Sequence, residues 1–436
     1  MAGPQTQELR RRHIAAVVAG NALEVYDFVI YSLFSIQIGH AFYPSKSAYA
    51  SLMLSLATFG AGFLTRPLGA IVLGGYADRV GRKAAMMLCF VLIGVAIVGM
   101  AVVPPYSSIG VAAPILAVLA RMTMGFSLGG EIGTNTAYLA EAAPPHNRGL
   151  VISWQPVGQA LAFVAGGLVG LAVTTWLPAT AVDAYGWRIA FLLGAITVPF
   201  GLWLRTRLPE TLHSAEEPGI VAAAAGESRL VLARRTWRIF GLGLMYIASG
   251  TMATYVFNYV ATYAQATLHL SARVGYLAET GGYLISIPVV LLSGWLSDRY
   301  GRKPINVYGN LVLLVLTYPT FVWIVRSGTP GVFLFGMMLL SVVSSISVIY
   351  VSISESIPKS IRGSGFSLTY SLAVVVFGST TQPIVTWLIH ATGNPMAPGW
   401  YLTGAAVLGQ IAVMLFPESA PVRLAAKSRA ALRASA

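Results

Sequence analysis

The sequence predicts an all-α polytopic membrane protein, with twelve transmembrane helices in two pseudo-symmetric six-helix bundles. Of its 436 residues, 56% are hydrophobic and only 10% are charged, which is too little polar surface to cover a water-soluble globule. The apolar residues form stretches of about 20 to 28, long enough for a helix to cross the roughly 30 Å hydrocarbon core with some tilt. Strands of a membrane barrel would be about ten residues long and would alternate in polarity, so that class is excluded.

A charged ten-residue pattern, present twice, divides the chain into halves. Residues 74–83 read GGYADRVGRK, and residues 294–303 read GWLSDRYGRK. Each copy places an Asp, two Arg and a Lys in a connector between two apolar stretches, so these charges must lie at a membrane surface. Residues 209–211 (PET) and 417–419 (PES) are a further echo. The two halves therefore share one helix plan.

The predicted spans follow from the apolar stretches in chain order. They lie at residues 14–39, 49–74, 84–103, 111–140, 150–176, 188–206, 238–264, 275–296, 304–325, 331–354, 364–390 and 399–416. The first is interpreted as a retained helix, because Asn21, Glu24 and Asp27 interrupt it, whereas a cleaved signal peptide has a short uncharged core. The longest polar interval, from Arg207 to Arg235, is the expected linker. The predicted organisation is an N-terminal bundle at 1–206, a cytoplasmic linker at 207–236, a C-terminal bundle at 237–418 and a short cytoplasmic tail at 419–436.

The basic residues predict the orientation in the membrane. With both termini inside, the cytoplasmic segments hold 22 Lys and Arg and the opposite face holds 4, as the positive-inside rule requires. We therefore expect a multi-pass protein of the cell membrane with both termini in the cytoplasm. The same distribution explains the net charge of +13 without a nucleic-acid partner. The single cysteine, Cys89, excludes an intrachain disulfide.

The doubled Gly-x-x-x-Asp-Arg-x-Gly-Arg-Lys loop and the six-plus-six layout resemble the major facilitator superfamily of transporters over the whole chain. Within it, residues 20–28 (GNALEVYDF), residues 66–69 (RPLG), and Arg121 with residues 129–131 (GGE) resemble the metabolite:proton symporter family. That family includes carriers of citrate, tricarballylate, ketoglutarate, shikimate and betaine or proline. The sequence of the first span is most similar to that of the citrate and tricarballylate branch.

Five ionisable residues lie inside the predicted spans of the first half: Glu24, Asp27, Arg66, Arg121 and Glu131. An unpaired charge at mid-bilayer costs about 2.5 to 3.5 kcal/mol on insertion scales, so these side chains must face one another or a watery cavity. Three acids against two arginines leave one acid without a permanent partner, and burial then favours its neutral form, so that it can load and release a proton. The alternative is that all five form closed ion pairs that only hold the helices together.

We expect Asp27 and Glu131 to be the leading proton carriers, with Glu24 and Arg121 in the same proton-coupling group. The resemblance implies this coupling for Asp27 with Arg121, an Asp in the first span and an Arg in the fourth. Arg66 is predicted to lie at the same depth as Asp27, where it is available to an anionic substrate, because its planar fork grips a carboxylate. Glycines at 125 and 129 are expected to let the fourth span approach the first closely.

Polar aromatic residues dominate the second half. Residues 255, 258, 259 and 263 fall on one face of the seventh span. Tyr263 and Tyr370 are interpreted as interfacial anchors and Glu279, near the outer end of the eighth span, as structural. The predicted substrate-binding residues are Arg66, Arg121, Asn21, Tyr26, Tyr255, Asn258, Tyr259 and Gln382.

The charges of the repeated loops are interpreted as a gate that holds the cytoplasmic side closed, a role that the family resemblance supports. In the first half the gating residues are Asp78, Arg79, Arg82, Glu141 and Arg148. In the second half they are Asp298, Arg299, Arg302, Glu355 and Arg362.

The expected function is secondary active transport: proton-coupled uptake of a small organic acid, a di- or tricarboxylate such as citrate, by alternating access. The alternatives are symport of shikimate or of a zwitterion such as betaine or proline, and a transporter-like sensor that binds without translocating. A tail of 18 residues after Glu418 without heptads disfavours an osmosensing betaine carrier. No enzyme, cofactor or metal site is expected, because the six histidines lack metal spacing and no Walker loop is present. The protein is expected to be a monomer.

Overall fold

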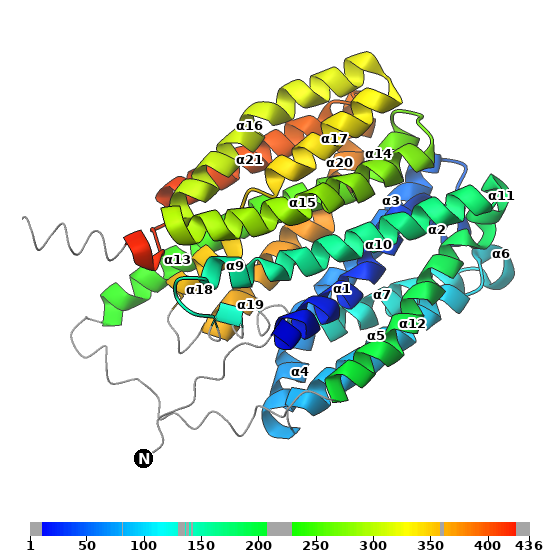
Figure 1. Ribbon diagram of the computed structural model, residues 1–436. Helices are drawn as coiled ribbons and strands as arrows, with labels where there is room; N and C mark the ends of the chain where they lie inside the picture. The colour runs from blue at the N-terminus through cyan, green and yellow to red at the C-terminus, as the bar shows by residue number, and fades with distance from the viewer. Residues whose placement is uncertain are drawn as a thin grey trace, which may run out of the picture.

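The protein is helical throughout the residues that its computed structural model describes, which are 11–80, 82–129, 136, 139–140, 143–206, 229–357 and 362–423, apart from turns and short connections. In Figure 1 the helices lie in two groups, one drawn largely from the first half of the chain and one from the second. This arrangement confirms the all-α class with two bundles that the sequence predicts.

The first group holds the helices of the N-terminal half. They are α1 (Arg11–Leu33), α2 (Ser35–Phe42), α3 (Ala48–Leu64), α4 (Arg66–Val80), α5 (Arg82–Val102), α6 (Tyr106–Ile109), α7 (Ala112–Leu128), α9 (Arg148–Ile152), α10 (Trp154–Trp176), α11 (Ala179–Ala181), the π-helical turn η1 (Val182–Gly186) and α12 (Trp187–Thr206). Phe34 interrupts the first span and Thr65 the second.

The second group holds the helices of the C-terminal half. They are α13 (Arg229–Asn258), α14 (Val260–Ala266), α15 (Ala272–Tyr300), α16 (Arg302–Ser327), α17 (Pro330–Ser344), α18 (Ile349–Ser356), α19 (Arg362–Ala373), the π-helical turn η4 (Val374–Gly378), α20 (Ser379–Thr392) and α21 (Ala397–Leu415).

Each of the twelve predicted spans contains described helix. Eight described helical segments are long and apolar enough to cross a membrane, and they match the second, fifth and seventh to twelfth spans. The third and fourth spans are represented by the shorter apolar helices Met87–Val102 and Ala112–Leu128. The first and sixth correspond to α1 with α2 and to α12. Of the predicted linker, residues 207–228 lie outside the described part of the chain.

The tenth span is broken between Ser344 and Ile349, where α17 ends and α18 begins. Asn306 of α16 bridges this break: its side-chain oxygen accepts a 2.8 Å hydrogen bond from the backbone N–H of Val348, and its amide donates to Ser352 at 2.9 Å. Non-helical backbone at membrane depth is tolerated only where protein or water satisfies its polar groups. The break therefore points to an internal cavity beside it.

Helices α10 and α15 form the seam between the halves, and they run side by side in Figure 1. A Cβ atom on Gly167 of α10 would lie 2.0 Å from the hydroxyl of Thr280 on α15. At the second charged repeat, a Cβ atom on Gly294 would lie 2.2 Å from the hydroxyl of Ser153. Gly294 opens the second charged repeat, so its identity is explained by the close approach of the two halves at this point.

The glycines of the fourth span pack against the second span, not against the first as the sequence suggested. A Cβ atom on Gly125 would lie 1.4 Å from the backbone oxygen of Gly62, and one on Gly129 would lie 2.0 Å from that of Arg66. Small residues serve the expected purpose, which is close backbone contact. The partner differs because α7 crosses α3 and α4 on this face, while Arg121 projects toward α1.

Candidate functional site

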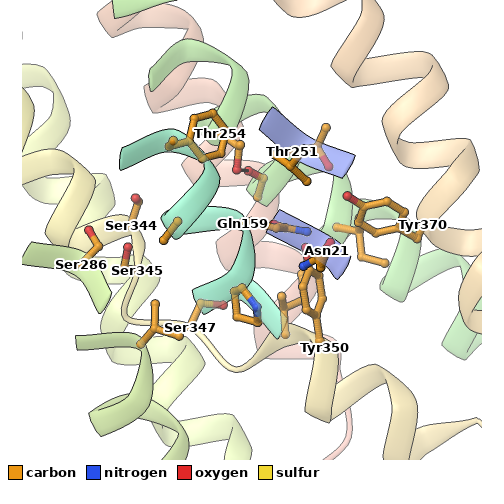
Figure 2. A pocket seen from close by; sticks show the side chains of 18 of the residues that line it. Asn21, Gln159, Thr251, Thr254, Ser286, Ser344, Ser345, Ser347, Tyr350 and Tyr370 are labelled. Atoms are coloured by element: carbon orange, nitrogen blue, oxygen red, sulfur yellow. Dashed lines mark hydrogen bonds between the residues drawn. The ribbon is translucent and has the colours of Figure 1, made fainter. Parts of the chain in front are cut away.

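A cavity of about 220 Å³ lies between the two halves. This is somewhat below the usual range of about 300 to 1,000 Å³ for ligand pockets, so it suits a small molecule. Its polar lining residues are Asn21, Arg66, Ser153, Gln159, Thr251, Thr254, Tyr255, Asn258, Tyr283, Ser286, Ser344, Ser345, Ser347, Tyr350 and Tyr370. Figure 2 shows the serines of α15 and of the α17–α18 break on one side, and Asn21, Tyr350 and Tyr370 on the other.

Arg66 is the single charged residue among those described as lining this cavity. It is the first residue of α4, directly after the break at Thr65, and its side chain is buried. The guanidinium carbon lies 4.7 Å from the ring centroid of Phe28 and 4.5 Å from that of Phe63. Aromatic faces stabilise a cation and fix its orientation. The cavity therefore offers one oriented positive group in a lining of hydroxyls and amides.

Asp27 and Arg121 form a buried ion pair just beyond the cavity. One guanidinium nitrogen of Arg121 donates to Asp27 at 2.7 Å, and the two side chains are 0% and 1% exposed. Within the described residues, the other carboxylate oxygen of Asp27 and two nitrogens of Arg121 have no hydrogen-bond partner. The pair is thus held by one bond instead of a two-bond fork, which is a weaker arrangement for two fully desolvated charges.

Phe28 connects the ion pair to the cavity. The guanidinium carbon of Arg121 lies 4.4 Å from the Phe28 ring, which also contacts Arg66 and lines the cavity. One aromatic ring therefore lies against both Arg121 and Arg66.

Gln159 of α10 is a cavity residue that the sequence did not single out. Its side chain lies within hydrogen-bonding reach of the hydroxyls of Tyr350 and Tyr370, which come from the other half. Figure 2 shows the three side chains together with Asn21. The available signal was an uncharged polar residue in the middle of an apolar span. Tyr370, interpreted from the sequence as an interfacial anchor, is a cavity residue instead.

At the end of the molecule that carries the charged repeats, a network of ion pairs and hydrogen bonds joins the halves. Arg302 donates to Asp298 at 2.7 Å and to both oxygens of Glu355 at 3.1 Å. Arg148, from the N-terminal half, lies 3.5 Å from Glu355. The backbone N–H groups of Gly149 and Leu150, also from the N-terminal half, donate to Asp298 at 2.9 and 3.0 Å.

These contacts differ in one respect from the predicted gate. The sequence places Arg148 in a cluster with residues of its own half, whereas the structure brings it to Glu355 of the other half. Arg299 does not join these ion pairs, because its guanidinium carbon lies 4.0 Å above the ring of Trp295. The side chains of Asp78, Arg79, Arg82, Glu141 and Arg362 lie outside the described part of the chain.

At the opposite end, hydrogen bonds and a ring contact join the halves. Ser35 hydrogen-bonds Thr262 at 2.9 Å, and Ser32 donates to the backbone oxygen of Asn258 at 2.9 Å. The rings of Tyr49 and His390 stack with centroids 3.8 Å apart. Both ends of the cavity are therefore bridged between the halves in this conformation.

Four of the predicted substrate-binding residues line the cavity: Asn21, Arg66, Tyr255 and Asn258. The other four are Tyr26, Arg121, Tyr259 and Gln382, and their side chains are engaged elsewhere. Tyr26 donates to the backbone oxygen of Ala190, and Arg121 donates to the carboxylate of Asp27. Tyr259 accepts a hydrogen bond from the hydroxyl of Thr386, and Gln382 donates to the hydroxyl of Ser32. The sequence identified the right helices, but adjacent positions on a helix face different directions. The side chain of Glu24 and the whole of Glu131 lie outside the described residues.

Comparison with known proteins agrees with this architecture. Residues 13–217 match the family model "Sugar (and other) transporter", and residues 242–436 match "Major Facilitator Superfamily". The chain is 35% identical to a citrate–proton symporter of Salmonella typhi, over 96% of each chain. It is 30% identical to a proline/betaine transporter of Escherichia coli K12, over 94% of this chain and 84% of that one.

The fold is also that of a solved structure. The crystal structure of a D-xylose–proton symporter superposes with a TM-score of 0.74, at 20% identity, over 94% of this chain and 98% of the other. Three observations agree: the two bundles enclose a cavity, the charged repeat is present in both halves, and relatives at 30 to 35% identity match nearly the whole chain. This chain belongs to the major facilitator superfamily of membrane transporters.

Proposed function

We propose that this protein is a proton-coupled symporter that takes up a small organic acid, a di- or tricarboxylate such as citrate, by alternating access. The observation that carries the proposal is Arg66, a buried cation that faces a small central cavity in which the other described lining side chains are uncharged. An arginine in this position can hold a carboxylate through its guanidinium fork, beside or in place of the contacts that it makes in this conformation. The names of the relatives support both the proton coupling and the organic acid.

The proposed proton-coupling group is Asp27 with Arg121, together with Glu131 and Glu24. Protonation of Asp27 removes the negative partner of Arg121 and so weakens the hydrogen bond that holds the guanidinium to Asp27. The positive charge of Arg121 lies against Phe28, one ring away from the substrate anchor Arg66. A proton on Asp27 and an anion at Arg66 therefore favour each other's binding, which is the thermodynamic basis of symport.

The proposed gate on the cytoplasmic side comprises Arg148, Asp298, Arg302 and Glu355. These groups join α9 to α15, α16 and α18, so opening of the cavity to that side must break the contacts of Arg148 and Asp298 across the halves. We further propose the organisation expected from the sequence: bundles at 1–206 and 237–418, a cytoplasmic linker at 207–236, a cytoplasmic tail at 419–436, and both termini inside.

A zwitterion such as betaine or proline is a second candidate substrate. Besides Arg66 for the carboxylate, the cavity contains the rings of Tyr255, Tyr350 and Tyr370. Aromatic rings bind quaternary ammonium groups by cation–π attraction, and the 30% identical relative is named for proline and betaine. The absence of a second described cation in the cavity is compatible with a substrate that carries one carboxylate.

The test is uptake of labelled citrate into proteoliposomes under an imposed inward proton gradient. Uptake is expected to depend on the gradient, to be abolished by an uncoupler, and to be blocked by unlabelled tricarballylate. Competition by betaine or proline without competition by tricarboxylates would replace the organic acid by the zwitterion. Counterflow without a gradient separates transport from sensing, because a sensor that only binds exchanges nothing.

A further inference from the structure

Glu279 of α15 is a buried acid that the proposed coupling group does not include. Its side chain is 3% exposed, and neither carboxyl oxygen has a hydrogen-bond partner within the described residues. It lies seven residues after the start of α15, about 10 Å along the helix axis. This position is inside the membrane, in the half of the bilayer away from the charged repeats.

No cation faces Glu279 from the helices packed against α15, within the described residues. Helices α10 and α17 carry no ionisable residue, and the Tyr263 hydroxyl of α14 donates to the backbone oxygen of Pro395. Arg148 and Arg302 meet near Asp298, 19 residues and thus about 28 Å further along α15. The guanidinium of Arg273 binds the backbone oxygen of Thr174.

A carboxylate in this environment would be a desolvated charge without compensation, which is among the most unfavourable arrangements in a protein interior. The protonated acid is neutral and costs far less to bury. In the conformation described here, Glu279 is therefore best accommodated with a proton bound.

Tyr283 offers a route between Glu279 and the cavity. It lies one turn further along α15, on the same face as Glu279. It lines the cavity, its ring stacks on Phe163 with centroids 4.0 Å apart, and its buried hydroxyl has no hydrogen-bond partner within the described residues. A hydroxyl both donates and accepts, so it can pass a proton between the carboxyl group and cavity water.

The seam between α10 and α15 controls access of water to Glu279. Thr280, the next residue, lies against Gly167, and the ring of Tyr276 lies against Gly170, so the two helices touch on both sides of this position. The hydroxyl of Tyr276 also donates to the backbone oxygen of Leu33 in α1. These contacts join opposite halves, so they separate when the carrier opens on this side.

We propose that Glu279 is a second proton-binding group of the transport cycle. It takes a proton from water when the outer ends of α10 and α15 are apart, and it holds that proton while they are in contact. The proton then leaves through Tyr283 to the cavity when the cytoplasmic side opens. This inference rests on the proposed symport, to which it adds one proton for each substrate carried.

The first experiment needs no substrate. Infrared difference spectra of the full chain in lipid compare wild type with Glu279→Gln, Glu279→Asp and the exposed control Asp183→Asn. We expect a protonated-carboxyl carbonyl band near neutral pH that E279Q loses, E279D shifts and the control retains. An unchanged band in E279Q would overturn the proposal.

The second experiment measures the number of protons per substrate. With a pH difference of one unit and no membrane potential, the loss of one coupled proton lowers steady-state accumulation about tenfold, because one pH unit is a tenfold ratio of proton activity across the membrane. E279Q is expected to show this drop while counterflow persists, and E279D is expected to restore accumulation. Unchanged accumulation in E279Q would overturn a role in the cycle even if the infrared band is lost.

The two proposals fail separately. If wild type accumulates neither citrate nor betaine under a proton gradient, the proposed function is wrong, and the infrared comparison alone then decides whether Glu279 holds a proton.

Discussion

Arg121 donates a single 2.7 Å hydrogen bond to Asp27, and the ion pair that they form is excluded from water. A desolvated pair held by one bond is sensitive to the charge of either partner, because loss of one charge leaves the other buried without compensation. This sensitivity is what a proton-operated switch requires.

We expect Asp27→Asn to abolish uphill uptake while it leaves exchange intact. The amide mimics the protonated acid in size and cannot release a proton, so the carrier shuttles substrate without following the proton gradient. Accumulation under an imposed gradient and counterflow without one should be measured in the same proteoliposome preparation. If accumulation persists in the variant, Asp27 does not carry the coupled proton.

Arg66→Gln is expected to raise the KM for citrate by about ten- to a hundredfold. A hydrogen bond to a charged group contributes about 1.5 to 3 kcal/mol, and glutamine keeps much of the side-chain length without the charge. Initial rates against citrate concentration give KM. The matched control is Arg326→Gln, at an exposed arginine near the outer end of α16. Equal KM values in the two variants would remove Arg66 from the binding site.

Glu355→Gln is expected to weaken the closure of the proposed cytoplasmic gate. The Glu355 carboxylate lies against Arg148 and accepts hydrogen bonds from Arg302 and Ser419, and the amide cannot satisfy two guanidinium groups. A cysteine at Ser345, in a Cys89→Ser background, reports on access to the cavity. Alkylation of this cysteine by a charged reagent from the cytoplasmic side should be several-fold faster in E355Q. Unaltered alkylation would show that the ion pairs do not limit opening.

Gly125→Ala is expected to destabilise the protein by about 3 kcal/mol or more, because overpacking of this severity forces the backbones apart. The added Cβ atom would lie 1.4 Å from the backbone oxygen of Gly62. Gly99→Ala is the matched control, since a Cβ atom there meets nothing within 4 Å. Thermal unfolding in detergent should show a lower midpoint for the first variant and little change for the second. Equal midpoints would contradict the close packing of α7 on α3.

The fold was predictable because membrane spans and duplicated loops leave strong local signals. That Asp27 and Arg121 need partners was also predictable, since charges inside apolar helices must be compensated. Their link to each other was implied by the family resemblance, whereas the residues alone placed Asp27 at the depth of Arg66. The pairing of Arg148 with Glu355 could not be predicted. The internal repeat shows that the two halves share one plan, but it carries no information on which residues of one half contact the other. The partner of Gly125 was missed for a similar reason: a small residue predicts close approach without naming the neighbour.

Which polar side chains point into the cavity could also not be predicted from the sequence. Asn21 faces the cavity, whereas Tyr26 on the same helix points to Ala190. Gln159 gave no signal apart from its polarity, because its neighbours Tyr350 and Tyr370 come from another bundle. Such assignments need the relative rotation of the helices, which is set by packing across the whole molecule.

Contacts between the halves close both ends of the cavity in this conformation. The ion pair of Arg148 with Glu355 lies at one end, and the hydrogen bonds of Ser35 and Arg273 with the opposite half lie at the other. A molecule held in the cavity is therefore occluded, and it can leave only after one of these two sets of contacts has broken. Under alternating access such a state is the intermediate that lies between the two open forms of the transporter.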